Sequence, residues 1–303
     1  MKLYRVLLFA LCKVLSNRAS TNPHNMSALE NVRSLRLNSI YGNGDRRNDI
    51  LCCHSGDVDR FDSLVVFFPG DVQDYREAME SHLENRKFLP WNLEDVGLTL
   101  LGQFPTSLLF VVKASQVTGG TFACYRNFVT SNHLGIPQFT DYYGSWKHLE
   151  VLIANAIDQL GFPASHLPIT LIGFSKGCVV LNQLVYELSE SWKECSAFID
   201  KVKAICWLDG GHAGQNSTWL TDTSRLKILA HKMSNCKFQV DVSPYQVRDR
   251  SRPWIGRQEN EFVQQMMAAG VDIRVFMHFE NEKRSIENHF RVIDQFRPFW
   301  LTK

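Results

Sequence analysis

Residues 173–177, Gly-Phe-Ser-Lys-Gly, have the composition and the setting of a hydrolytic nucleophile. They follow an apolar run at 169–172 and precede apolar residues at helical spacing from 178 onward. A G-x-S-x-G sequence between a strand and a helix forms a sharp turn, which needs small residues two positions either side of the serine and lifts its hydroxyl clear of the sheet. We therefore predict that Ser175 is a nucleophile that attacks a carbonyl carbon.

Such a nucleophile needs two backbone N–H groups that stabilise the negative oxygen of the tetrahedral intermediate. The N–H of Lys176 is the first, because it opens the following helix; we expect its side chain to be solvated. The second is expected from the loop after 64–68, at Asp71 or Val72. The Asp71 carboxylate would repel an oxyanion unless it points away, and the alternative is a plain turn in which Asp71 or Asp74 caps a helix.

The base is expected to be a histidine late in the chain, because the order in this type of site is serine, acid, histidine. His289 fits: it follows an expected strand at 273–277 and precedes a helix expected from about residue 290, with Asn288 as its cap. His278 ends the strand and is a weaker candidate, while His212 lies too early. His289 is therefore the predicted base.

Two aspartates between Ser175 and His289 are candidates for the acid that orients the histidine. Asp249 lies in the loop after an expected strand at 238–242, which is where the acid of such sites normally lies, and we prefer it. Asp209, at the end of the preceding strand, is the alternative, because neighbouring arginines could bind Asp249 instead.

The elements that must position these residues alternate between strand and helix. A hairpin is expected first, with strands at 35–41 and 50–53 around a Gly/Asn-rich turn. Continuous apolar runs then predict buried parallel strands, the last four about 34 residues apart, which suits β–α units. This pattern predicts an α/β-hydrolase fold: a mostly parallel central sheet, helices on both faces and an N-terminal antiparallel hairpin. The runs lie at 64–68, 108–112, 169–172, 204–208, 238–242 and 273–277, and helical spacing occurs at 75–86, 148–160, 179–188, 226–233, 262–269 and 290–299.

Composition excludes several other kinds of protein. The 303 residues are 45% hydrophobic and 21% charged, with a net charge of +2, so we expect a globular domain with no nucleic-acid surface. The eight cysteines form no CxxC pair and no zinc-like spacing with histidine, so we expect buried, reduced thiols and no metal site. Residues 210–214 contain glycines without the dinucleotide-binding spacing, so no cofactor is predicted.

The first 34 residues differ from the rest and are predicted to be a targeting segment and a linker, ahead of a domain at 35–303. The apolar run 6–12 is too short for a transmembrane span. Four basic residues and no acidic residue precede Glu30, and the basic ones at 2, 5 and 13 lie opposite an apolar face of a helix. This pattern favours a mitochondrial transit peptide and a matrix location; a secretory signal is the alternative.

Residues 115–145 are a long stretch with Gly119-Gly120 and several aromatic side chains. Because the stretch lies where a cap or active-site loop is inserted in such folds, we predict a lid. Its apolar character favours a small-molecule or lipid acyl substrate. Nothing in the sequence identifies a protein partner.

Four segments together resemble one family. They are Phe67-Phe68-Pro69-Gly70-Asp71-Val72-Gln73, residues 171–178 around the serine, Pro244-Tyr245-Gln246-Val247-Arg248-Asp249, and Glu287-Asn288-His289-Phe290. With these, the chain from about residue 35 resembles the family of α/β-hydrolase-like proteins named for open reading frame 69 of chromosome 2. The resemblance implies a mitochondrial protein of the hydrolase fold and specifies no substrate.

Two classes of function fit these residues. The first is a serine hydrolase of the esterase, lipase or thioesterase type, with Ser175, Asp249 and His289 as its triad; an acyltransferase could use the same serine. The second is a non-catalytic hydrolase-like protein that has a binding or regulatory role in mitochondria. The charges of Asp71 and Lys176 beside the serine favour the second class, and the ordered triad favours the first.

Overall fold

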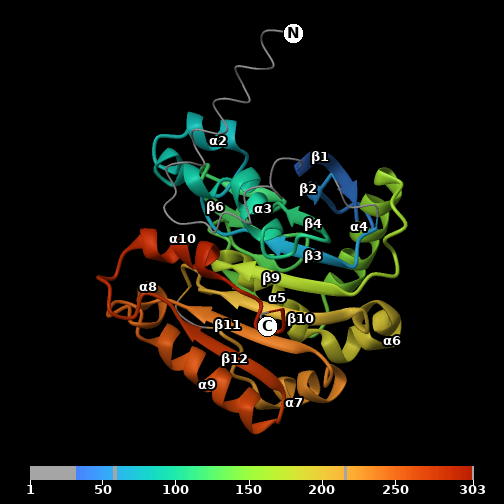
Figure 1. Ribbon diagram of the computed structural model, residues 1–303. Coiled ribbons are helices and arrows are strands. Elements are labelled where there is room, and N and C mark those ends of the chain that lie inside the picture. The colour runs from blue at the N-terminus through green and yellow to red at the C-terminus, as the bar shows by residue number, and fades with distance from the viewer. Residues whose placement is uncertain (1–31, 57–59, 215–216, 302–303) are drawn as a thin grey trace.

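The computed structural model describes residues 32–56, 60–214 and 217–301. In these residues, eight strands form one sheet in the order β1-β2-β4-β3-β9-β10-β11-β12 (Figure 1). The predicted targeting segment lies outside the described residues, except that residues 32–34 begin β1. The strands are β1 (Val32–Tyr41), β2 (Arg47–Ser55), β3 (Ser63–Phe68), β4 (Ser107–Val112), β9 (Ile169–Phe174), β10 (Val202–Leu208), β11 (Lys237–Val242) and β12 (Asp272–Met277).

The pairing of the strands confirms the predicted fold class. β1 and β2 form an antiparallel hairpin, and β2 also pairs antiparallel with β4. From β4 to β12 each neighbouring pair is parallel. Every predicted strand is present, because continuous Val, Ile, Leu and Phe runs suit strands that are covered on both faces. The chain has the α/β-hydrolase fold, and the carboxyl ends of β3, β9, β10 and β11 meet along one edge of its sheet.

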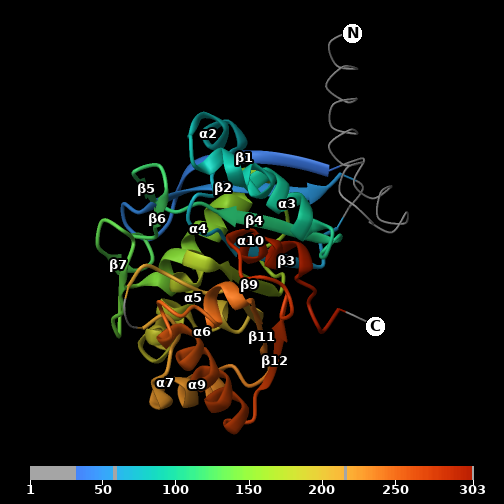
Figure 2. The same ribbon diagram turned by 90° about the vertical axis from the view of Figure 1, so that its left-hand side faces the viewer.

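Helices cover both faces of this sheet, as Figure 2 shows. Buried side chains from α4, α5, α6, α7 and α9 form one cluster with one set of strand residues. Side chains from α3 and α10 form a second cluster with the alternate set. The helices are α2 (Arg76–Ser81), α3 (Leu93–Leu101), α4 (Ser145–Leu160), α5 (Cys178–Tyr186), α6 (Leu188–Ile199), α7 (Thr223–Lys232), α8 (Pro244–Val247), α9 (Trp254–Ala268) and α10 (Ile286–Gln295), with 3-10 turns η3 (Asn85–Trp91) and η4 (Ser175–Gly177).

Several helical predictions differ from the structure. Helix 75–86 is cut short, because His82 has extended backbone after α2 and η3 follows. The sequence pattern missed α6, placed the start of α9 at residue 262 instead of Trp254, and missed α3, whose N-cap Asn92 accepts a hydrogen bond from the Asp95 N–H. The last helix begins and ends earlier than expected: Ser285, not Asn288, caps its start, and Pro298 prevents its continuation to residue 299 because the residue before a proline disfavours helical backbone.

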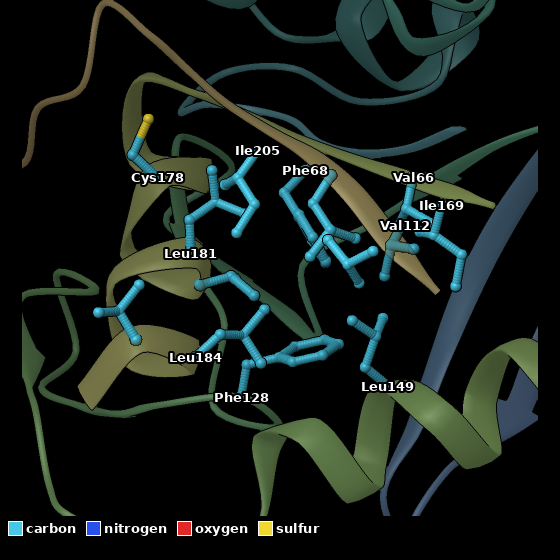
Figure 3. Close-up of a cluster of buried hydrophobic side chains, with 14 of the residues drawn as sticks. Val66, Phe68, Val112, Phe128, Leu149, Ile169, Cys178, Leu181, Leu184 and Ile205 are labelled. Atoms are coloured by element: carbon cyan, nitrogen blue, oxygen red, sulfur yellow. The ribbon is translucent and has the colours of Figure 1, made fainter. Parts of the chain in front are cut away.

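Residues 115–145, hereafter the insertion, contain two small antiparallel sheets. These sheets pair β5 (Gln116–Thr118) with β6 (Phe122–Cys124), and β7 (Thr130–Ser131) with β8 (Pro137–Gln138). Phe128 of the insertion is fully buried, and Figure 3 shows it between Leu149 and Leu184 in the main core. Part of the insertion is therefore packed into the hydrophobic core of the domain.

Two further findings concern the whole described chain. The seven cysteines within it are all buried, as expected from their apolar neighbours. None of the described helices is long and apolar enough to cross a membrane.

Candidate active site

Ser175 occupies a strained turn between β9 and α5. Its φ is 50°, a left-handed conformation that non-glycine residues rarely adopt. The flanking glycines make this turn possible: a Cβ on Gly177 would lie 1.9 Å from the carbonyl oxygen of Phe68, and one on Gly173 would lie 2.9 Å from the Cys178 nitrogen. The local geometry is therefore that of a nucleophile elbow, with the serine at the carboxyl end of β9.

The loop after β3 approaches the serine closely. A Cβ on Gly70 would lie 2.9 Å from the Cβ of Ser175. The Gly70 N–H donates to Gln73 Oε1 at 2.7 Å, and the Val72 N–H donates to the Thr121 carbonyl at 2.8 Å. Among the described residues the Asp71 N–H has no such partner, so the structure leaves Asp71, rather than Val72, as the free donor in this loop.

His289 packs against Phe174 of the elbow and is hydrogen-bonded to Asp209. The distance from His289 Nδ1 to Asp209 Oδ2 is 2.7 Å, and both side chains are buried. Ser243, which follows β11, donates its N–H to Asp209 Oδ1 at 2.7 Å and its hydroxyl to Oδ2 at 2.5 Å. The carboxylate of Asp209 is thus held by three donors, which fix its orientation toward the histidine.

The preference for Asp249 as the acid is corrected by this geometry. Asp249 Oδ2 lies 2.8 Å from Arg252 Nε and 2.8 Å from an Arg284 guanidinium nitrogen, and Oδ1 accepts from the Ser251 N–H. Burial alone would raise the pKa of Asp249, but the hydrogen bond from Arg252 and the nearby charges lower it overall. Asp249 is the salt-bridged loop acid that its neighbouring arginines suggested.

Aromatic rings hold His289 on two sides. Its imidazole lies 4.6 Å from the Phe174 ring and 4.9 Å from the Tyr245 ring, tilted by 32° and 31°. Phe174 directly precedes Ser175, so the imidazole of His289 packs against the elbow. Among the described residues, however, no hydrogen bond joins the Ser175 hydroxyl to His289; catalytic bonds of this kind are often long before a substrate binds.

The other histidines have separate roles. His278 Nε2 lies 2.7 Å from Asp241 Oδ1. His212 is buried near the elbow, and burial lowers its pKa to about 4. Its Nδ1 accepts from the Gly214 N–H at 3.0 Å, and its Nε2 lies 3.2 Å from the Ser217 carbonyl. His278 and His212 are therefore both bound to partners other than Ser175.

The side chain of Lys176 is buried, contrary to the expectation that it is solvated. Its exposed fraction is 0%. Nζ donates to the Leu134 carbonyl at 2.9 Å and lies 3.6 Å from Asp71 Oδ2. The Asp71 carboxylate also accepts from the Ala123 N–H at 2.8 Å. Both charges beside the serine are therefore turned toward the insertion.

Access to the serine is restricted. Ser175 is 8% exposed. A cavity of about 140 Å³ lies between α7 and α9, and another of about 60 Å³ lies near the start of β11; neither is lined by Ser175 or His289. The described residues contain no cluster of three side chains able to hold a metal ion.

Sequence reasoning missed two residues of this site, Ser243 and Tyr245. Both lie in the short segment after β11, and the Ser-Pro pair at 243–244 was a signal for a helix start. Ser243 accepts from the Tyr245 N–H as N-cap of α8. The same serine that caps α8 thus also holds Asp209.

The chain that carries this site matches a known family over most of its length. The family model described as C2orf69 matches residues 36–166 and 163–272. The chain belongs to the C2orf69 family. Within this family it is 38% identical over 292 residues to the "Mitochondrial protein C2orf69 homolog" of Danio rerio, covering 86% of this chain and 85% of the relative. It is 34% identical over 322 residues to the homolog of Mus musculus, covering 88% of each.

Solved structures that are similar to this C2orf69-family chain include two esterases. A thermostable esterase from Pseudomonas putida ECU1011 is 10% identical with a TM-score of 0.49, covering 88% of this chain and 78% of the esterase. Enterochelin esterase from Shigella flexneri is 13% identical with a TM-score of 0.49, covering 88% and 59%.

Proposed function

We propose that this member of the C2orf69 family is a serine hydrolase, with Ser175 as nucleophile, His289 as base and Asp209 as acid. One observation carries the proposal: the 2.7 Å hydrogen bond from His289 Nδ1 to Asp209 Oδ2, on the elbow that holds Ser175 at a φ of 50°. Because Asp209 accepts from Nδ1–H, we assign the proton of the neutral imidazole to Nδ1. Nε2 then keeps a lone pair that can take a proton.

In the proposed reaction, Ser175 Oγ bonds to the carbonyl carbon of an ester or thioester while His289 Nε2 takes the hydroxyl proton. The carbonyl oxygen becomes negative and is stabilised by the N–H groups of Lys176 and Asp71. The bond to the alkoxide or thiolate then breaks, and the leaving group takes the proton from His289. Water attacks the acyl-enzyme in the same way, which releases a carboxylic acid and restores Ser175.

The substrate class and the location are part of the proposal. The apolar and aromatic residues of the insertion support a small-molecule or lipid acyl substrate and a covering role for residues 115–145. The names of the relatives describe mitochondrial proteins, and the basic, acid-free N-terminal segment supports transit to the matrix.

The test is covalent labelling of the purified protein with a fluorophosphonate probe. We expect labelling of the wild type and no labelling of Ser175→Ala. Ser81→Ala is the matched control, because Ser81 is exposed and donates to the Ala78 carbonyl far along the chain from the elbow; it should label like the wild type. A wild type that is folded by circular dichroism but does not label would contradict the proposal and favour a non-catalytic binding or regulatory protein.

A further inference from the structure

The ammonium group of Lys176 is a buried charge that the proposed reaction does not use. Burying a cation away from solvent costs free energy unless hydrogen bonds and an opposite charge compensate for the lost hydration. Here the compensation comes from the Leu134 carbonyl at 2.9 Å and from Asp71 Oδ2 at 3.6 Å. The lysine therefore joins the elbow to the loop after β3 and to the insertion.

Asp71 completes this arrangement from the opposite side. Its carboxylate points to the Ala123 N–H and to Lys176, while its own N–H is free among the described residues. Burial raises the pKa of Asp71, and the charge of Lys176 opposes that change. The side chain is thus directed toward Lys176 and Ala123, which lessens the repulsion that an acid at this position would otherwise cause to the proposed oxyanion.

The insertion contacts the loop after β3 at further points. The Tyr125 hydroxyl donates to the Pro69 carbonyl at 2.6 Å, and the Val72 N–H donates to the Thr121 carbonyl at 2.8 Å. Gly135 passes directly above the lysine: a Cβ there would lie 3.2 Å from Lys176 Nζ and 2.3 Å from the Ala123 carbonyl. Figure 2 shows β5, β6 and β7 of the insertion together at one end of the molecule.

We propose that the side chains of Lys176 and Asp71 are positioning residues that fix both oxyanion donors. The pair joins the segment that carries the Lys176 N–H to the segment that carries the Asp71 N–H, and it attaches both to the insertion at Leu134 and Ala123. This inference rests on the proposed function. Its physical basis is that donors stabilise a transition state only when they are held in place before charge develops, and small displacements are costly.

The first experiment measures hydrolysis of p-nitrophenyl butyrate by Lys176→Met and Asp71→Asn. For each variant we expect kcat to fall about 10- to 100-fold, less than the loss of a whole oxyanion donor, while KM stays within about threefold. The inhibition constant of a trifluoromethyl ketone, which mimics the tetrahedral intermediate, should rise in parallel with the fall in kcat. The double variant should lose little more than either single one, because the two side chains act as a unit.

A matched control is Lys113→Met, which breaks another Lys–Asp pair near the same loop. Lys113 Nζ lies 2.6 Å from Asp74 Oδ1 and contacts neither the elbow nor the insertion through this pair. This variant should keep the wild-type kcat. An unchanged kcat in both Lys176→Met and Asp71→Asn would overturn the positioning proposal. Should Lys176→Met fail to fold, Asp71→Asn decides alone, since asparagine can still accept from the Ala123 N–H.

A second measurement does not depend on catalysis. In a Ser175→Ala background, we expect Lys176→Met to speed hydrogen exchange at the Ala123 amide and across residues 130–138 at least about tenfold. Exchange at the wild-type rate would contradict the positioning proposal alone. A wild type that hydrolyses no ester, combined with faster exchange in the variant, would contradict the proposed hydrolase function alone.

Discussion

In the proposed active site, the side that carries the base His289 and the side that carries the oxyanion donors are built in different ways. On the base side, Asp209 and Ser243 directly follow the adjacent parallel strands β10 and β11, and His289 belongs to α10, which packs on the sheet. On the oxyanion side, Asp71 lies in a loop whose contacts run to the insertion and to Lys176. The base side is thus fixed by the sheet and the oxyanion side by a segment outside it.

This difference predicts how each side responds to change. Residues on the base side are few, and each makes a specific hydrogen bond. Replacing a single atom there, as in Asp209→Asn, should therefore abolish most of the hydrolytic activity. The oxyanion side is held by several contacts, so single changes should reduce the rate without removing it. The predictions below test this contrast, from the largest expected effect to the smallest.

The two aspartates after β10 and β11 give the largest contrast. Asp209→Asn should lower kcat about 10⁴-fold, because an amide nitrogen facing Nδ1 favours the wrong tautomer of His289. Asp249→Asn should keep kcat within about threefold but lower stability, since two guanidinium groups lose their shared carboxylate. Steady-state kinetics and thermal unfolding distinguish them. A larger loss of kcat in Asp249→Asn than in Asp209→Asn would reverse the assignment of the acid.

The elbow lies between the two sides of the proposed site, so a substitution that strains it should disturb both sides. Gly177→Ala places a methyl group 1.9 Å from the Phe68 carbonyl oxygen, and we expect a loss of about 3 kcal/mol in the free energy of unfolding. Gly44→Ala is the control: its φ is 62°, but nothing lies within 4 Å, so the cost should be about 1 kcal/mol. Denaturant unfolding measures both, and equal losses would show that the close approach at the elbow is unimportant.

Low pH should lower the free energy of unfolding through His148, which packs against the insertion at Phe128. This histidine packs against Phe128, its Nδ1 accepts from the Asn43 N–H, and burial lowers its pKa from 6.5 to about 3. Between these pH values the unfolded chain binds one more proton than the folded chain, so stability falls as pH falls below 6.5, by up to ~1.4 kcal/mol per pH unit.

His148→Gln removes this titrating group and should flatten the dependence of the free energy of unfolding on pH between 6.5 and 4. His212, whose pKa burial lowers to about 4, should retain part of the slope. Unfolding measured in urea at several pH values provides the comparison. A variant with the slope of the wild type would exclude His148 as the source.

The smallest expected effect concerns the ring that covers His289. Tyr245→Leu removes an aromatic contact at 4.9 Å, worth roughly 0.5–1.5 kcal/mol, and should lower kcat up to about tenfold. Tyr245→Phe keeps the ring and should behave like the wild type. If Tyr245→Phe loses as much rate as Tyr245→Leu, the hydroxyl rather than the stacked ring is responsible.

Much of the fold could be predicted because its signals are local. Apolar runs marked every strand of the main sheet, and the pattern Gly173-x-Ser175-x-Gly177 marked the elbow. The steric exclusion is local at Gly173, where a Cβ would meet Cys178, but at Gly177 it comes from Phe68, which only the fold brings near. Helices α3 and α6 were missed, and α9 begins at Trp254, before its predicted start at residue 262. The start of α10 was misplaced because Ser285 and Asn288 are both good caps, and the choice between them depends on packing.

The sequence by itself determined which residue types are available: a serine in a strand-to-helix turn, two candidate aspartates and a late histidine. Tertiary structure decided which aspartate meets His289, because β10 and β11 are neighbours in register and bring Asp209 against Ser243, while arginines occupy Asp249. It also decided that Lys176 is buried, since Leu134 and Asp71 lie 42 and 105 residues away along the chain and only folding brings them to one ammonium group.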